Sequence, residues 1–236
     1  AANAPGADLL FTLANSSSYG GAGYAAARIT TLAGFHPQSG EIAIHETAHS
    51  LANLADEYET GGPVNYTGPE RPEANASIRN AESMEAAGAK WHLWLREIGG
   101  VLDGPVDAYL GCYYSSFGVY RPSPNSRMRA LFNPFNAPSV EAIIKSIYTF
   151  VRPIDALSPP ITAEITHTSL LTVTPLRPHD FELTISWFLD GQPIPGAHAE
   201  TLNLAALSIP PNARSVTVRV RDDNPMVRDP AVRDQF

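Results

Sequence analysis

The chain has 236 residues, with 24 acidic and 16 basic side chains and a formal net charge of −8 at neutral pH. Nucleic acids and anionic membranes attract clustered Lys and Arg, so this balance argues against either as a partner. There is no apolar run of about 18 residues, so no membrane span is expected. The length fits one large domain or two modest ones.

The first predicted elements are two strands. Residues 8–14 form a short apolar run that predicts a buried strand. Residues 24–32 follow the glycine-rich turn at residues 19–23 and predict a neighbouring strand or an edge strand. The N-terminal residues 1–5 lack the basic and apolar regions of a signal peptide. We therefore expect either a mature chain whose export signal has been removed or a chain that starts inside a longer protein.

Residues 40–53 predict a helix that carries an H-E-x-x-H motif. His45 and His49 lie about one turn apart on one face of such a helix, and Glu46 reaches the same space. Two neutral imidazoles can hold a zinc ion, and the carboxylate can take a proton from a zinc-bound water, as in zinc peptidases. The alternative is a buried helix whose histidines only form hydrogen bonds. It is disfavoured because burying these side chains without a metal is costly.

A third protein ligand is needed, because catalytic zinc sites normally have three protein ligands and a water. In metzincin peptidases the helix ends at a glycine, and the third ligand lies six residues after the second histidine. Ala55 has that position here and cannot bind a metal, whereas Asp56 can. Glu57 is the alternative if this assignment is one residue too early. Asn53 is expected to replace the glycine in the left-handed conformation that ends the helix.

The next segments are less regular. Residues 59–80 are rich in Gly, Pro, Asn and Glu, which predicts an ordered surface loop or a mobile flap. Residues 81–98 predict a helix. Ser139 is a good N-cap for a final helix at residues 140–148, whose apolar stripe indicates packing rather than chemistry. Cys112 is the only cysteine, so no disulfide can form within the chain, and we expect it to be a buried apolar residue.

A proline-rich stretch at residues 152–160 predicts the boundary between two domains, 1–155 and 160–236. β-rich runs follow at 161–173, 181–189, 201–207 and 215–220, and Asp190-Gly191 predicts a tight turn after a strand that contains Trp187. This pattern predicts an all-β immunoglobulin-like sandwich without the usual disulfide. The sandwich is short enough to lack a final strand, so the natural chain could continue past Phe236.

Residues 45–58 resemble the H-E-x-G-H and L-A-D-E-Y pattern of the bacterial IgA metallopeptidase family. They also resemble, with one extra residue, the L-P-D-x-Y ending of snapalysin, in which the aspartate is the third ligand. Further similarities lie at Tyr113-Tyr114, residues 118–122, Arg127-Met128-Arg129 and the helix at 140–148, so the resemblance spans roughly residues 8 to 155.

The resemblance implies an α+β (α/β-type) metzincin-like zinc peptidase domain, secreted or on the surface of a bacterial cell. One zinc ion per chain would be held by His45, His49 and Asp56, and Glu46 would act as general base and then as proton shuttle. Tyr120 is predicted to be catalytic, with Arg121 as a second candidate, because a hydroxyl or a guanidinium can stabilise an oxyanion. Packing is the alternative role for Tyr120.

Three hypotheses compete. The leading one is a zinc endopeptidase that acts on a protein or peptide substrate. The second is a zinc-binding but non-proteolytic adhesin or binding module, which would have no use for the base Glu46. The third places the third ligand on a later helix, at Glu82 or Glu85, and the L-A-D-E-Y ending around Asp56 argues against it. The sequence indicates neither the peptide bond cleaved, in IgA or another protein, nor the oligomeric state.

Overall fold

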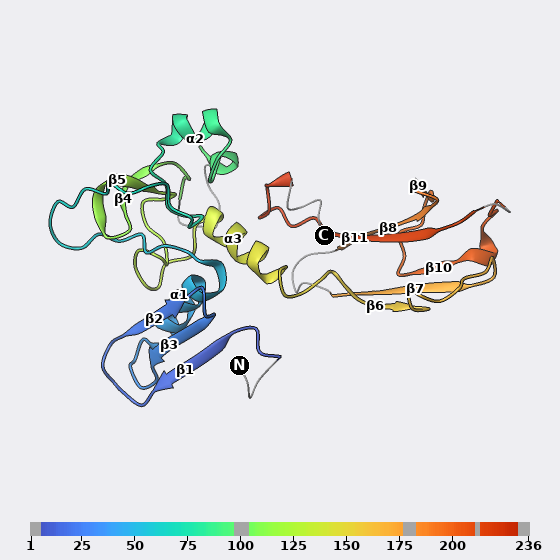
Figure 1. Ribbon diagram of the computed structural model, residues 1–236, viewed down its shortest axis with the longest axis horizontal. Coiled ribbons are helices and arrows are strands. Elements are labelled where there is room, and N and C mark those ends of the chain that lie inside the picture. The colour runs from blue at the N-terminus through green and yellow to red at the C-terminus, as the bar shows by residue number, and fades with distance from the viewer. Residues whose placement is uncertain (1–5, 97–103, 177–182, 211–212, 231–236) are drawn as a thin grey trace. The chain divides into compact units, whose positions relative to one another are not determined.

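The computed structural model describes residues 6–96, 104–176, 183–210 and 213–230. The chain divides into two compact units, Ala1–Phe150 (unit 1) and Val151–Phe236 (unit 2). The described residues contain three α-helices and four small sheets, so the architecture is mixed helix and sheet (Figure 1). Within the described residues, no helix is both long and apolar enough to cross a membrane.

Unit 1 begins with a three-stranded sheet of β1 (Leu10–Ala14), β2 (Gly21–Tyr24) and β3 (Ile29–Ala33), in the order β1-β3-β2. β1 runs parallel to β3, and β2 runs antiparallel to it. The strand predicted at residues 24–32 exists as β3, which pairs with β1 as its neighbour, but its predicted extent is wrong. The glycine-rich segment itself forms β2, and the chain turns back before β3 at Arg28, whose φ is 53°.

β1 was predicted to be buried, and this prediction is also wrong. The side chains of Phe11 and Leu13 are 52% and 66% exposed. The reason is that β1 is an edge strand, which within the described residues pairs with β3 alone. The apolar run therefore predicted the strand correctly, but it did not indicate whether neighbouring elements bury the side chains of that strand.

Helix α1 (Ser39–Ala52) packs against β2 and β3 and carries the H-E-x-x-H motif. The buried hydroxyl of Thr30 on β3 lies 2.6 Å from that of Ser50, which fixes the helix on the sheet. The helix ends at Asn53, whose φ of 49° and ψ of 45° are left-handed. This confirms the role predicted for Asn53, since asparagine tolerates that conformation better than most residues.

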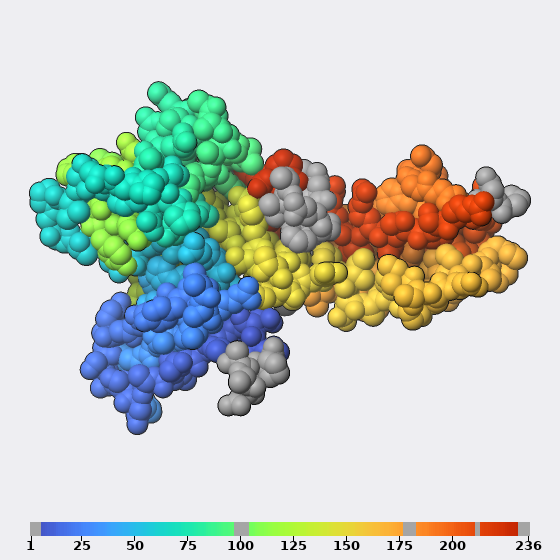
Figure 2. Space-filling model, viewed as in Figure 1, coloured from blue at the N-terminus to red at the C-terminus, as the bar shows by residue number. Residues whose placement is uncertain are grey.

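The middle of unit 1 is mostly irregular chain around a hairpin of β4 (Tyr109–Cys112) and β5 (Ser115–Arg121). Residues 59–80 lie along the hairpin: Glu59 bridges to Tyr114 in its turn, and Asn65 and Ser77 bridge to β5. In Figure 2 the N-terminal sheet forms the blue part of unit 1, and residues 59–96 form its cyan to green part. Cys112 is fully buried, as predicted.

The two later helices differ from their predicted bounds. α2 (Ala81–Ala87) ends at Gly88, whose φ is 56°, and a 3-10 turn at His92–Trp94 follows. The helix predicted for residues 81–98 is therefore too long, and residues 97 and 98 lie outside the described residues. α3 (Ala137–Ile147) begins before the predicted residue 140, because Asn136 and not Ser139 is its N-cap.

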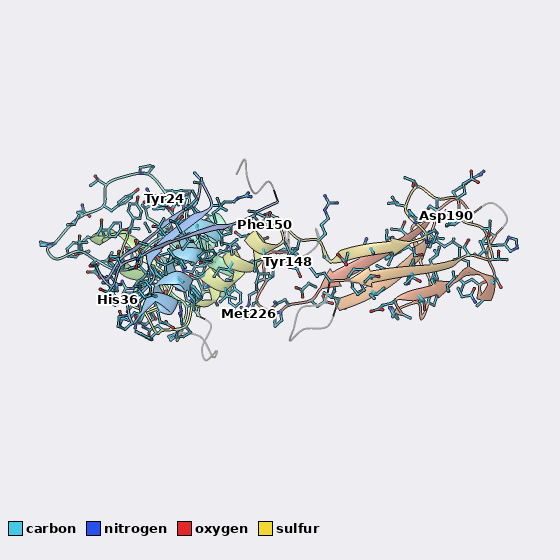
Figure 3. The ribbon with its side chains drawn as sticks, turned by 90° about the horizontal axis from the view of Figure 1, so that it is seen from below. Tyr24, His36, Tyr148, Phe150, Asp190 and Met226 are labelled. Atoms are coloured by element: carbon cyan, nitrogen blue, oxygen red, sulfur yellow. The ribbon has the colours of Figure 1, made fainter. Side chains whose placement is uncertain are left out.

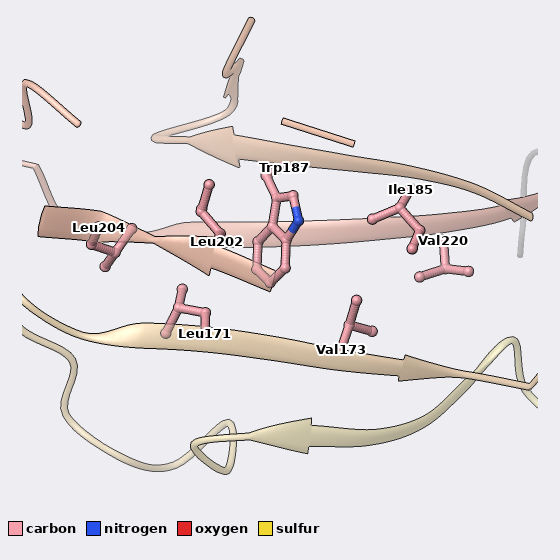
Figure 4. Packing of buried hydrophobic residues seen from close by; sticks show 7 residues of the cluster. All are labelled: Leu171, Val173, Ile185, Trp187, Leu202, Leu204 and Val220. Carbon is pink, nitrogen blue, oxygen red and sulfur yellow. The ribbon is translucent and has the colours of Figure 1, made fainter. Parts of the chain in front are cut away.

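In the part of unit 2 that the structure describes, two three-stranded sheets share one apolar core. The strands are β6 (Ile154–Ser158), β7 (Leu170–Pro175), β8 (Leu183–Leu189), β9 (Gln192–Pro193), β10 (Thr201–Asn203) and β11 (Val216–Asp222), with a 3-10 turn at Leu204–Ala206. The sheet orders are β10-β7-β6 and β11-β8-β9. Figure 4 shows Trp187 among the aliphatic side chains of this core.

Two sequence predictions for unit 2 can be judged. Asp190 and Gly191 have φ values of 49° and 79° and join β8 to β9, which confirms the predicted tight turn (Asp190 in Figure 3). The proline-rich stretch predicted as the domain boundary is not all irregular chain, because β6 lies within it and pairs with β7. The strand has only five residues and lies between Pro153 and Pro159, so no alternating pattern long enough to predict it is present. The immunoglobulin-like topology stays a prediction.

Candidate metal centre

The structure brings His45, His49 and Asp56 together. The Nε2 atoms of the two histidines lie 3.1 Å apart. Oδ1 of Asp56 lies 3.0 Å from Nε2 of His45 and 3.2 Å from Nε2 of His49. Among the described residues, these three form the group of His, Cys, Asp and Glu side chains that can hold one metal ion. The left-handed turn at Asn53 redirects the chain so that Asp56 faces the helix.

Each ligand candidate is oriented by a second contact. Nδ1 of His45 lies 2.9 Å from the carbonyl oxygen of Arg127, and Nδ1 of His49 lies 2.5 Å from that of Leu54. A carbonyl only accepts hydrogen bonds, so each Nδ1 carries the proton and each Nε2 presents a lone pair. Oδ2 of Asp56 accepts a hydrogen bond from the hydroxyl of Tyr114, which leaves Oδ1 toward the histidines.

The loop that carries Asp56 is fixed at its backbone on both sides. The amide of Asn75 accepts a hydrogen bond from the backbone N–H of Ala55 (2.8 Å) and donates one to the carbonyl of Ala55 (2.9 Å). The carbonyl of Asp56 accepts a hydrogen bond from the backbone N–H of Tyr113 (2.9 Å). The position of this carboxylate is therefore set by segments distant in the sequence.

Burial and hydrogen bonding act in opposite directions on these side chains. Burial by itself would raise the pKa of Asp56, but the facing imidazoles of His45 and His49 and the hydroxyl of Tyr114 outweigh it and hold that pKa well below its usual range. Burial by itself would lower the pKa of His49, but the nearby carboxylate of Asp56 stabilises the protonated imidazole and raises that pKa. Asp56 is thus an anion facing two imidazole nitrogens, and such a group of donor atoms can hold a cation.

Glu46 lies beside this group, on the side toward β2. Burial raises the pKa of its carboxyl, although the nearby histidines and the N–H of Gly23 stabilise the anion. A Cβ atom on Gly21 would lie 2.6 Å from Cγ2 of Ile42, and one on Gly23 would lie 2.5 Å from Cβ of His49. The two glycines of β2 therefore allow the strand to lie directly on the face of α1 that carries the motif.

A cavity of about 370 Å³ opens over Glu46. It is bounded by the start of β2, by α1, by Tyr58 and by the segment from Arg127 onward. Its lining residues are Tyr19, Gly20, Gly21, Ile42, His45, Glu46, Tyr58, Arg127, Arg129, Ala130 and Leu131. Burial raises the pKa of Tyr58 to about 12, so its hydroxyl stays protonated and can donate a hydrogen bond.

Tyr120 does not line this cavity. It lies on β5, where its backbone forms a two-way bridge with Ser77. The guanidinium of Arg121 donates to the carbonyls of Leu110, Gly111 and Ser123, so within the described contacts it serves the hairpin. The sequence analysis did not assign roles to Tyr58 and Tyr114. A signal existed, since Tyr58 ends the L-A-D-E-Y motif and Tyr114 belongs to a motif of the same resemblance.

The other carboxylates that the sequence offered as third ligands have different partners. Glu57 is fully buried, and its carboxylate is hydrogen-bonded to Asn75, Ser126 and Asn136. Glu85 pairs with Arg96 at 2.8 Å. Glu82 lies in the first turn of α2 and is not part of the group that gathers around His45. The geometry thus points to Asp56.

Comparison with known proteins agrees with the metal centre. Residues 1–105 match the model of a protein family described as IgA Peptidase M64. The family predicted from the motifs is therefore confirmed for this part of the chain, which includes His45, Glu46, His49 and Asp56. The match ends before the hairpin of β4 and β5, so the resemblance predicted for the segments from Tyr113 to residue 155 stays a prediction. No curated protein matches the chain.

Proposed function

We propose that the protein is a zinc-dependent endopeptidase that hydrolyses peptide bonds of a protein or peptide substrate. The observation that carries the proposal is the convergence of His45, His49 and Asp56, with the carboxylate of Glu46 beside them in an open cavity. The match to a peptidase family supports the same class of reaction. A metzincin-like fold for unit 1, an immunoglobulin-like fold for unit 2, and secretion or a cell-surface location are parts of this proposal.

The donor set fits zinc. Two neutral imidazoles and one carboxylate are ordinary ligands of a catalytic zinc ion, which keeps a further position for water. Two atoms that each lie about 2.1 Å from one tetrahedral ion are about 3.4 Å apart. The three donor atoms here are 3.0 to 3.2 Å apart, slightly closer than that. A bound zinc ion would lower the pKa of its water toward ~7 and polarise the substrate carbonyl.

Glu46 is proposed to move the protons. Its carboxylate takes a proton from the attacking water and then passes it to the nitrogen of the leaving amine, which must be protonated to depart. The hydrogen bond from the N–H of Gly23 orients the carboxylate for this work. The proposed base is therefore positioned by a strand as well as by its own helix.

The substrate is proposed to lie along β2. Within the described residues, β2 pairs on one side only, with β3, so its other edge offers backbone groups to an extended peptide. The same strand begins at the cavity, where Gly21 and Glu46 are both lining residues. Tyr58 also lines the cavity, so its hydroxyl is a better candidate than that of Tyr120 for stabilising the oxyanion.

The experiment that tests the proposal is the Glu46→Gln variant, assayed by casein or peptide-library cleavage with zinc content measured on the same sample. Glutamine keeps the size of the side chain but loses its basicity, so hydrolysis should fall by about 10²–10⁴-fold or more while zinc stays near one per chain. His49→Ala should lose the zinc, and His167→Ala, which removes a histidine of unit 2, should keep both zinc and activity. Full activity in Glu46→Gln would contradict the mechanism.

A further inference from the structure

We infer that Glu57 is a positioning residue for the metal centre: its buried carboxylate holds the loop that carries Asp56 against the segment that orients His45. The inference rests on the proposed function, because it concerns the same metal site. It gives a role to a buried ionisable side chain that neither binds the ion nor lines the cavity.

The carboxylate of Glu57 is fully buried among neutral hydrogen-bond donors. Oε1 accepts from the side-chain amides of Asn75 (2.8 Å) and Asn136 (2.9 Å), and Oε2 accepts from the hydroxyl of Ser126 (2.7 Å). Burying a carboxylate is expensive unless its oxygens are satisfied. A purely apolar or amide side chain would avoid that cost, so the presence of an acid at this position calls for an explanation beyond packing.

The three partners come from three segments that meet at the metal centre. Asn75 also holds Ala55, the residue before Asp56, through both its N–H and its carbonyl. Ser126 precedes Arg127, whose carbonyl accepts the hydrogen bond from Nδ1 of His45. Asn136 is the N-cap of α3, where its Oδ1 accepts from the N–H of Ser139.

The backbone of Glu57 strengthens the same link. Its N–H donates to the carbonyl of Met128 (2.8 Å), and its carbonyl accepts from the guanidinium of Arg129 (3.2 Å). Met128 is fully buried in a cluster with Ala48 and Leu54, beneath the helix that carries the histidines. Residue 57 is therefore joined by side chain and backbone to the segment that faces α1.

The geometry has a direct consequence for metal binding. Asp56 is the neighbour of Glu57, and His45 is oriented by the carbonyl of Arg127, so the distance between these two ligands depends on how residue 57 is joined to residues 126–128. Outer contacts of this kind typically change metal affinity by 10- to 100-fold when they are lost. We therefore expect Glu57 to act on the metal through Asp56 and His45, without touching it.

The test uses the whole chain and cobalt(II) as the probe, since its visible absorption reports the number and arrangement of ligands. In Glu57→Gln the amide places N–H groups opposite donors of Asn75, Ser126 or Asn136. Cobalt and zinc affinity should fall by about 10- to 100-fold, and the cobalt spectrum should change. Glu73→Gln is the matched control, because Glu73 is another buried glutamate of the same region but is paired with Arg71 away from the ligands.

A double variant separates positioning from stability. Glu57→Gln with Asn136→Asp exchanges donor for acceptor, and aspartate can still cap α3. It should recover most of the affinity and the wild-type cobalt spectrum, whereas Asn136→Asp alone, which places two carboxylates together, should bind cobalt more weakly. Thermal unfolding of the metal-free proteins shows which variants fold. If Glu57→Gln does not fold, Glu57→Asp replaces it, because aspartate keeps the charge on a shorter side chain.

The outcomes are distinct. A folded Glu57→Gln or Glu57→Asp protein with wild-type cobalt affinity and spectrum would overturn the inference while leaving the zinc peptidase proposal intact. So would a double variant whose affinity is no better than that of Glu57→Gln. Absence of cobalt and zinc binding by the unaltered chain would instead overturn the proposed function, and with it the role assigned to Glu57.

Discussion

Tyr113 and Tyr114 form the two-residue turn between β4 and β5, with φ values of 50° and 62°. Turns of this kind favour Asn and Gly, because left-handed backbone is costly for side chains as bulky as tyrosine. The turn is held at both residues, since the N–H of Tyr113 donates to the carbonyl of Asp56 and the N–H of Tyr114 donates to that of Tyr58. The result is that the hydroxyl of Tyr114 reaches Oδ2 of Asp56.

We predict that Tyr114→Phe weakens zinc binding by about tenfold, because Asp56 loses the donor that fixes its second oxygen. The stability of the fold should change little, since the side chain of Tyr114 is 40% exposed. Zinc affinity measured by competition with a chelator checks the prediction. Tyr113→Phe is the control, because it keeps the ring that lies under Arg71. Unchanged affinity in Tyr114→Phe would show that the contact does not matter to the ion.

Among single residues, the sequence predicted the site residues that lie close to one another along the chain. The spacing of His45 and His49 and the motif around Asp56 predicted the group that the structure brings together. Tyr114 lies 58 residues from Asp56, and its approach depends on the pairing of β4 with β5 and on the loop contacts of Tyr113. No local pattern encodes such a contact. The family resemblance includes Tyr114 in one of its motifs, but that signal alone does not rank Tyr114 above Tyr120.

Among the elements, α1 and β2 together make the site. β2 supplies the N–H of Gly23 to Glu46, and its two glycines remove the side chains that would separate strand from helix. The sequence analysis treated the glycines as a turn because glycine disfavours strands in general. Glycine is nevertheless found in a strand where another backbone approaches closely. Such an approach depends on the tertiary fold, so the composition of the segment does not show it.

We predict that Gly23→Ala destabilises unit 1 by about 1–3 kcal/mol or more, because the new methyl group would overlap the backbone of Glu46 and Cβ of His49. Relief of the overlap would move β2 away from Glu46, so hydrolysis should fall more than the loss of folded protein explains. Denaturant unfolding together with peptide cleavage measures both effects. Gly20→Ala is the matched control, since nothing lies within 4 Å of a Cβ atom there. Equal stability of the two variants would contradict the proposed contact.

For the whole molecule, each unit has its own apolar core. The core of unit 2 is built around Trp187 and Val173 (Figure 4). The metal centre is formed entirely by residues of unit 1. The sequence analysis placed the boundary in the proline-rich stretch, near where the units divide, because the composition changes there. It could not detect β6 in that stretch, since the strand is recognised by its pairing with β7 rather than by its own pattern.

We predict that a chain ending at Phe150 folds, binds one zinc ion and cleaves a short peptide at close to the rate of the whole chain. The cut has to precede β6, because a chain ending near Ser158 would keep an apolar strand without its partner β7. Zinc content, thermal unfolding and turnover of a short peptide should be compared for the two lengths. A large protein substrate should be cleaved in parallel, and a loss confined to that substrate would assign unit 2 to substrate capture. If the shorter chain is unfolded or insoluble, the two units fold as one, and the prediction is wrong.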